Sequence, residues 1–359
     1  MVQVVEAFNE SKAEAFAQNL LGILNSGALA LMTSIGHRTG LFDAMGQMQA
    51  ATSQEIADAA GLNERYVREW LGAMVTGGFI EHNALTQTYF LPPEHAAFLT
   101  REATPNNIAV SLQLIPLLAS VEDEILDCFE KGGGLPYSAY DRFHQVMAED
   151  SAQTVVSALK DGILPLIPDG IDRLNRGIDV LDLGCGRGRA LMEMASLFPN
   201  SNFTGIDFSK EAIADARSES TARGLTNIEF RVEDAAKFNE CDRYDLIFTF
   251  DAIHDQAHPD LVLQAIHRAL RKDGTYLMQD IRASSNVANN IDLPVAPFLY
   301  TVSCLHCMSV SLAMGGMGLG TMWGEELAFK MLRDAGFIGA ELKQLDHDIM
   351  NNYYLCRKN

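Results

Sequence analysis

The chain has 359 residues, 48% hydrophobic and 21% charged, which is typical of a soluble globular enzyme with two or three domains. Its formal net charge of −20 argues against nucleic-acid and anionic-membrane surfaces, because phosphate groups bind clustered lysine and arginine. Six cysteines without framework spacing favour reduced thiols and a cytoplasmic location, and no signal peptide or membrane span is apparent.

Residues 1–100 are predicted to form a small helical domain that ends in a hairpin. Thr52 and Glu55 make a capping box at the start of one helix, and a second helix begins near Asn63. Two short β segments follow within residues 79–91. The second helix has an apolar stripe formed by Val67, Leu71, Met74 and Val75. Two helices, a tight turn and a β wing predict a winged-helix domain.

A winged helix often binds DNA, but the charge of this one argues otherwise. Residues 41–100 hold seven acids and two arginines, and the second helix carries as many acids as bases. Phosphate would repel such a surface, so we expect no nucleic-acid binding. We interpret the domain as a dimerisation and lid module; a cofactor-sensing regulator remains the alternative.

Residues 101–175 read as a helical connector with a glycine break at 132–134, and residues 176–359 alternate strands with helices. A long insertion, 282–322, precedes a helix predicted at 324–335. The predicted strands are 178–183, 202–206, 228–232, 244–250, 275–280, 337–344 and 350–357. The fold class is therefore α/β, with a seven-stranded sheet closed by an antiparallel hairpin.

The most informative motif is the run Val-Leu-Asp-Leu-Gly-Cys-Gly-Arg-Gly at 180–188. Glycines at alternate positions allow a tight turn and a close approach of the backbone to a ligand. The dinucleotide fingerprint G-x-G-x-x-G/A fails here, because its third small residue falls on Arg189 or Leu191. The run, with Asp182, Gly184, Gly186 and Gly188, resembles the first motif of class I S-adenosylmethionine-dependent methyltransferases. This resemblance implies a Rossmann-like sheet.

Other cofactor-binding residues are expected at the ends of the following strands. Asp207 ends the second strand, where a carboxylate can accept hydrogen bonds from both ribose hydroxyls. The resemblance implies that Asp234 contacts the adenine amino group and that Asp182 positions the methionine ammonium. The predicted cofactor-binding set is completed by Phe208, Ala235 and Phe250.

The fourth strand leads into His254, and the fifth ends on Asp280. Together with the winged helix, this resembles small-molecule O-methyltransferases, in which a histidine at this position is the base and an acid orients it. An imidazole can take a hydroxyl proton while oxygen attacks the methyl group. The alternative is a histidine that contacts cofactor or water without moving a proton. Gln256 replaces the usual tryptophan, and residues 320–323 offer no second supporting acid.

A closer resemblance covers nearly the whole chain. Segments 250–256, 292–294, 296–300 and 304–307 look like the mycobacterial Rv2258c-type methyltransferases. That group has a winged-helix domain, a helical middle and a C-terminal methyltransferase domain. The resemblance implies use of S-adenosylmethionine and a homodimer.

The insertion is predicted to form the wall of a pocket for a small, largely apolar acceptor, because thioethers and aromatic rings suit such a pocket. Its predicted lining is Phe298, Tyr300, His306 and Trp323. Cys304, His306 and Cys307 lie too close together to complete a tetrahedral site, so no metal is expected. N-, S- or C-methylation without a base remains open, as does a nicotinamide-dependent oxidoreductase.

Overall fold

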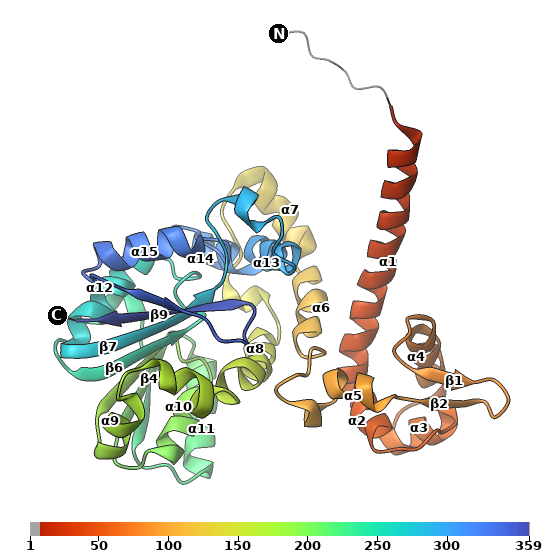
Figure 1. Ribbon diagram of the computed structural model, residues 1–359, viewed down its shortest axis with the longest axis horizontal. Coiled ribbons are helices and arrows are strands. Elements are labelled where there is room, and N and C mark those ends of the chain that lie inside the picture. Colours follow the sequence, from red (N-terminus) through yellow and green to blue (C-terminus); the bar gives the residue numbers. More distant parts are fainter. Residues whose placement is uncertain (1–7, 359) are drawn as a thin grey trace. The chain divides into compact units, whose positions relative to one another are not determined.

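A computed structural model describes residues 8–358. The chain divides into two compact units, Met1–Pro116 and Leu117–Asn359 (Figure 1). The boundary between the two compact units falls inside helix α6 (Leu114–Ala119). The domain boundaries at 100 and 175 that the sequence suggests stay predictions.

The first unit is built from helices around one small core. Its elements are α1 (Glu10–Thr39), α2 (Leu41–Gly46), α3 (Ser53–Ala60), α4 (Glu64–Thr76), β1 (Glu81–Asn83), β2 (Thr88–Phe90) and α5 (Pro93–Leu99). The predicted capping box is present, since Thr52 and Glu55 cap each other at the start of α3. Phe42 and Trp70 pack edge to face in the core, and β1 pairs antiparallel with β2. The winged-helix prediction is confirmed.

Short helices open the second unit. They are α7 (Glu122–Lys131), η3 (Tyr137–Ala139), α8 (Phe143–Ser151), the π-helices η4 (Ala152–Val156) and η5 (Leu159–Ile163), and α9 (Gly170–Arg176). Gly132 and Gly133, which follow α7, both have positive φ, so the predicted glycine break is where the chain turns. Val155 and Leu159 are buried against the sheet.

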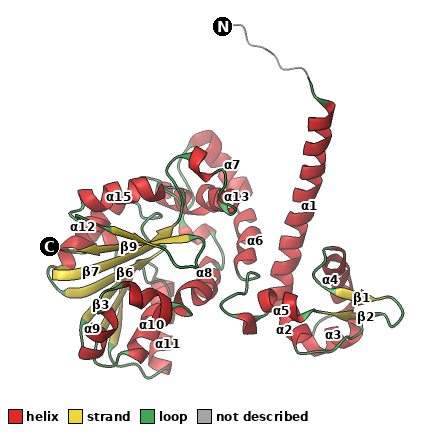
Figure 2. Ribbon diagram, in the orientation of Figure 1, coloured by secondary structure: helices red, strands yellow, loops and turns green. Residues whose placement is uncertain are grey.

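A seven-stranded sheet forms the centre of this unit, in the order β5-β4-β3-β6-β7-β9-β8 (Figure 2). The strands are β3 (Asp179–Leu183), β4 (Asn202–Asp207), β5 (Ile228–Val232), β6 (Tyr244–Phe250), β7 (Leu270–Ile281), β8 (Glu341–Lys343) and β9 (Asn351–Arg357). Strands β3 to β7 pair in parallel, and β9 pairs antiparallel with β7 and β8. The predicted Rossmann-like sheet with its antiparallel hairpin is confirmed.

Helices cover both faces of the sheet. They are α10 (Arg189–Leu197), α11 (Lys210–Ala222), α12 (Pro259–Ala269) and α15 (Gly324–Asp334). One buried cluster holds α10 and α11 residues with Phe248 and Leu277, and the other holds α12 and α15 residues with Ile247 and Tyr276. Because successive strand residues face opposite sides, neighbouring positions of β6 and β7 supply both cores. The carboxyl ends of the parallel strands meet at one edge, which is where such folds bind ligands.

The structure differs from the predicted elements in three places. Strand β7 begins at Leu270 rather than 275, because it runs through a bulged turn at Asp273, where φ is +63°. Strand β8 is shorter than predicted, since Gly336 and Gly339 take positive φ ahead of it. The insertion is largely helical, in α13 (Ala296–Val302), the π-helix η9 (Ser303–Cys307) and α14 (Met308–Ala313).

Candidate active site

The glycine run forms the turn between β3 and α10. Gly184, Gly186 and Gly188 have φ of +78°, +52° and +68°, values that residues with a Cβ rarely adopt. A Cβ on Gly184 would lie 2.6 Å from the Cβ of Ala252, and one on Gly188 would lie 2.3 Å from the Phe230 ring. Nothing lies within 4 Å of a Cβ on Gly186, so the middle of the turn faces open space. The turn is therefore shaped for close approach of a ligand to the backbone.

Two acids flank this turn. Asp207, at the end of β4, accepts hydrogen bonds from the Gly186 N–H at 2.9 Å and the Ser209 N–H at 2.8 Å. The Ser209 side chain caps α11, which leaves Asp207 free of that role. Asp182 is 2% exposed, and its Oδ1 has no hydrogen-bond partner in residues 8–358. Burial and the nearby Asp207 raise the pKa of Asp182 to about 7.

The other predicted cofactor residues lie along the same edge of the sheet. Asp234 accepts a hydrogen bond from the Ala236 N–H and forms an ion pair with Lys237 at 2.8 Å. Ala235 is buried, whereas Phe208 is 43% exposed. Phe250 is half-buried and its ring stacks on Phe248. All of these residues keep their cofactor-binding role as a prediction.

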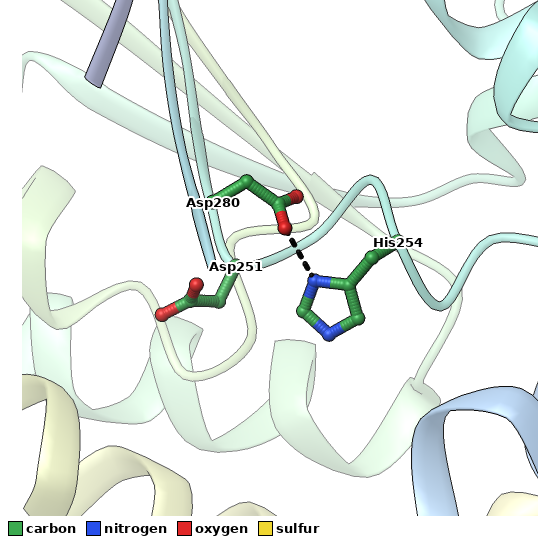
Figure 3. A group of neighbouring side chains, drawn as sticks. All are labelled: Asp251, His254 and Asp280. Atoms are coloured by element: carbon green, nitrogen blue, oxygen red, sulfur yellow. Dashed lines mark hydrogen bonds and ion pairs between the residues drawn. The ribbon is translucent and has the colours of Figure 1, made fainter. Parts of the chain in front are cut away.

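The predicted catalytic pair is assembled at the ends of β6 and β7 (Figure 3). His254 Nδ1 lies 2.8 Å from Asp280 Oδ1, and the two residues are 4% and 0% exposed. The same oxygen accepts hydrogen bonds from the Trp323 indole at 2.9 Å and from the Ile281 N–H at 2.8 Å. Three donors on one oxygen fix the orientation of the Asp280 carboxyl group. His254 Nε2 points away from Asp280, and Cys307 also makes a side-chain hydrogen bond to this imidazole.

The surroundings of His254 control its proton. Burial lowers the pKa of this imidazole, but the charge and hydrogen bond of Asp280, with a contribution from Cys307, raise it well above its usual value. A carboxylate on Nδ1 also selects the tautomer and supports the imidazolium that forms on proton transfer. The pair can therefore accept a proton from a hydroxyl group.

Residues of the helical segment 137–144 cover this edge of the sheet. The Tyr137 hydroxyl donates a hydrogen bond to the Asp255 carboxylate, and the Tyr137 ring centroid lies 5.1 Å from that of Phe208. Burial raises the pKa of Asp255 to about 6. Tyr137 thus contacts a residue next to His254 and a residue next to Asp207.

The predicted acceptor-pocket residues each make separate contacts in the structure. His306 is fully buried, stacks on Phe143 at 3.7 Å between ring centroids, and lies 3.5 Å from the Cys307 sulfur. Burial lowers its pKa to about 3, so the ring is neutral. Trp323 lies behind Asp280 as a donor. Phe298 packs in a small cluster with Leu299, and the Tyr300 hydroxyl accepts a hydrogen bond from Asn290. Their role toward an acceptor stays a prediction.

Sequence reasoning considered Cys307 only as a metal ligand, and it gave no role to Asp251 or Tyr137. Asp251, Tyr137 and the thiol of Cys307 all adjoin the His254 pair or its neighbour Asp255. Asp251 could have been noticed as an acid directly after a buried strand. Tyr137 and Cys307 come from segments far from the strand ends, and no local pattern marks them.

Two family models match the chain. Residues 27–101 match the Rv2258c-like winged HTH domain, and residues 174–315 match a methyltransferase domain. The chain joins an Rv2258c-like winged helix to a methyltransferase domain. The predicted resemblance is thereby confirmed, and so is the prediction of a methyltransferase domain from the glycine motif.

Curated relatives match parts of the chain. An (S)-coclaurine N-methyltransferase of Thalictrum flavum subsp. glaucum is 29% identical over 109 residues, 30% of each chain. A malonyl-[acyl-carrier protein] O-methyltransferase of Bacillus cereus is 28% identical over 139 residues, 39% of this chain and 47% of the relative. The chain thus spans less than half of the length of these two relatives.

Solved structures match over almost the full length. Human N-acetylserotonin methyltransferase, in complex with S-adenosylmethionine, has a TM-score of 0.71 at 15% identity and covers 99% of both chains. The mitomycin 7-O-methyltransferase MmcR has a TM-score of 0.69 at 16% identity and covers 97% of this chain and 100% of its own. At this level of identity the likeness establishes the fold alone.

The residues of the glycine turn fit S-adenosylmethionine, the cofactor of this domain class. The open cradle at Gly186 admits a ligand that a side chain would exclude. The unpartnered oxygen of Asp182 suits an ammonium group, and Asp207 has unused lone pairs for ribose hydroxyls. The predicted cofactor is therefore confirmed for the domain class, and this chain retains the groups to hold it.

Proposed function

We propose that the chain is an S-adenosylmethionine-dependent methyltransferase that methylates a small acceptor at oxygen, with His254 as general base. The observation that carries the proposal is the buried His254–Asp280 pair, completed by the Trp323 indole, at the same sheet edge as the glycine turn. A histidine that only touched cofactor would not require an orienting carboxylate held by three donors.

In this proposal one end of the sheet edge binds the cofactor and the other end removes the proton of the acceptor. When bound, S-adenosylmethionine supplies a methyl group activated on a sulfonium. Asp182, Asp207 and the glycine turn would hold the cofactor by its polar groups and so orient the methyl group. His254 Nε2 takes the proton of the acceptor hydroxyl, and Asp280 stabilises the imidazolium. Tyr137 and the segment around it exclude water, so positioning contributes much of the rate.

The test separates cofactor binding from turnover. Calorimetric titration with S-adenosylhomocysteine should show binding, and titration with NAD should show none. His254→Ala should lower kcat by about a hundredfold to ten-thousandfold and leave the affinity for S-adenosylhomocysteine unchanged. Unchanged turnover in this variant would leave N-, S- or C-methylation without a base as the better assignment. His82→Ala, which truncates an exposed histidine of β1, is the matched control.

The winged helix supports an enzyme rather than a DNA-binding regulator. Both arginines of α4 form ion pairs within the helix, Arg65 with Glu69 and Arg68 with Glu64. Helix α4 therefore offers phosphate no uncompensated cation. All six cysteines are free, in keeping with the cytoplasmic location that we propose. A salt-dependent mobility shift with genomic DNA at physiological ionic strength would overturn this assignment.

We also propose that a second copy of the chain covers the first half of α1. By length and composition α1 and Ala296–Ala313 could each cross a membrane, but 44% of the latter's apolar window is buried, against 0% for α1. The exposed apolar residues of α1 include Phe16, Leu20, Leu21, Ile23 and Leu24. Such a face on a water-soluble enzyme needs a partner surface.

Light scattering after size exclusion should give a dimer for the wild-type chain. Leu20→Glu with Leu24→Glu should give a monomer, because the charges cannot be buried at the interface. Gln18→Glu, on the same helix, is the control. A monomeric wild type that sediments with phospholipid vesicles would instead favour a membrane as the cover.

A further inference from the structure

Asp251 is a buried acid that the proposed mechanism does not use. It follows β6 directly and has a φ of +49°, in the left-handed region that side chains seldom adopt. Its backbone N–H donates to the Gln279 carbonyl, which ties it to β7. Its side chain lies beside the His254–Asp280 pair (Figure 3). The side chain is half-buried, whereas Asp280 is fully buried, so Asp251 is the carboxylate of the two that solvent or a ligand can reach.

Both carboxyl groups have an oxygen left over. Asp251 Oδ1 and Asp280 Oδ2 are buried and have no hydrogen-bond partner among the described residues. One ligand atom each from Asp251, His254 and Asp280 lie within 4.8 Å of one another. Two ionised carboxylates that are buried this close together have an unfavourable free energy unless a proton or a cation compensates their charge. A positive group beside Asp251 would compensate both oxygens.

The charges around Asp251 favour a cation over a neutral donor. Burial and then the charge of Asp280 raise the pKa of Asp251 well above its usual value. The charges of Asp348 and Asp150 raise this pKa as well. His254 is the one charge that acts in the opposite direction. Within residues 8–358, no lysine or arginine forms an ion pair with Asp251 or Asp280. Such a field attracts cations and repels anions.

A metal ion fits this place less well than an ammonium group. The Nδ1 atom of His254 is engaged by Asp280, so a metal beside Asp251 would lose either the imidazole or that hydrogen bond. Two carboxylate oxygens alone do not make a transition-metal site. An ammonium group needs only acceptors, and both leftover oxygens are acceptors.

We propose that Asp251 is an acceptor-binding residue that pairs with an ammonium group located beside the hydroxyl that faces His254. The inference rests on the proposed function and names its substrate class: a small amine with a neighbouring hydroxyl, rather than a wholly apolar acceptor. Asp251 holds the amine, and His254 takes the hydroxyl proton. The pairing also fixes which oxygen of the acceptor is methylated.

Three compounds on one ring scaffold test this: 2-hydroxybenzylamine, 2-hydroxybenzyl alcohol and salicylate carry a cation, a neutral donor and an anion beside the same phenol. Their affinities for the protein loaded with S-adenosylhomocysteine are measured by calorimetry. The amine should bind about tenfold or more tightly than the alcohol, and salicylate should bind most weakly. Equal binding of all three, tighter binding of salicylate, or no binding of any would overturn the proposal.

Asp251→Asn keeps the shape of the side chain and removes its charge. It should weaken amine binding by about tenfold or more and leave binding of the alcohol and of S-adenosylhomocysteine unchanged. Asp334→Asn, which neutralises an exposed acid of α15, is the matched control and should change none of the three affinities. An unchanged preference for the amine in Asp251→Asn contradicts the assignment.

Two further outcomes separate the alternatives. Micromolar binding of Mn²⁺ or Zn²⁺ that Asp251→Asn abolishes would replace the amine by a metal ion. Loss of S-adenosylhomocysteine binding in the wild type would be a failure of the proposed function, and it would be seen before any acceptor probe is added.

Discussion

The two ends of the active-site edge are built in different ways. At β3 and β4 the chain itself makes the site: glycines with positive φ and two acids lie within one continuous βαβ unit. At β6 and β7 the site is made of side chains from four separate segments, which hold one another by hydrogen bonds. The first end is adapted to a cofactor that binds through its polar groups, and the second to a reaction that needs a positioned proton acceptor.

This difference implies that the two ends fail differently when residues are changed. Losses at the glycine end should appear as weaker cofactor binding, whereas losses at the His254 end should appear as slower turnover with intact binding. Variants from the two ends should also combine additively in free energy, since they share no hydrogen-bond partner. Strong coupling between them would break the comparison.

The largest effect is expected for Asp207→Ala. It removes the acceptor for the ribose hydroxyls and a hydrogen bond to the Gly186 N–H, and we expect about a hundredfold weaker binding of S-adenosylhomocysteine by calorimetry. Turnover at saturating cofactor should change much less. Ser209→Ala removes the cap of α11 and costs about 1 kcal/mol of stability, yet it should bind cofactor normally. Equal loss of affinity in both variants would attribute the effect to the helix rather than to the carboxylate.

A smaller effect is expected for Trp323→Phe. The variant keeps the ring in the core but removes the indole donor to Asp280, so kcat should fall by about tenfold while cofactor affinity is unchanged. Trp70→Phe, which removes an indole hydrogen bond to Met32 in the winged helix, controls for the loss of stability. If Trp323→Phe altered cofactor affinity instead of kcat, the separation of the two ends would be wrong.

The smallest effect is the pH dependence, which sharpens the comparison because the two ends titrate separately. A cation binds the ionised form of Asp182, whose pKa is raised to about 7, so affinity for S-adenosylhomocysteine should increase several-fold as pH rises through that value. General-base catalysis needs neutral His254, whose pKa is also raised, so kcat should increase with pH on the alkaline side of the usual histidine range. Asp182→Asn should abolish the first dependence and preserve the second. If the pH profile of S-adenosylhomocysteine affinity were identical in Asp182→Asn and the wild type, this assignment would be wrong.

The same contrast explains what the sequence could predict. The fold and the glycine turn were predictable, since alternate glycines after a buried strand leave a local signature, and strand spacing in β3 to β6 is regular. His254 and Asp280 were found through family likeness and strand ends. The donor role of Trp323 and the contact of Tyr137 with Asp255 depend on where distant segments pack, and local spacing does not encode that. The second supporting acid sought among residues 320–323 has no counterpart there: an indole supplies a hydrogen bond from that region instead.

The position of β9 in the sheet has a consequence for biosynthesis. β9 lies between β7 and β8, and its Asn352 is opposite Asp280, although a ribosome adds it long after Asp280 has left the exit tunnel. The glycine end can fold once its βαβ unit has emerged from the ribosome, whereas one edge of β7 stays unpaired until β9 is made. A nascent chain of this protein should therefore complete the glycine end of the site before the edge of β7 that carries Asp280.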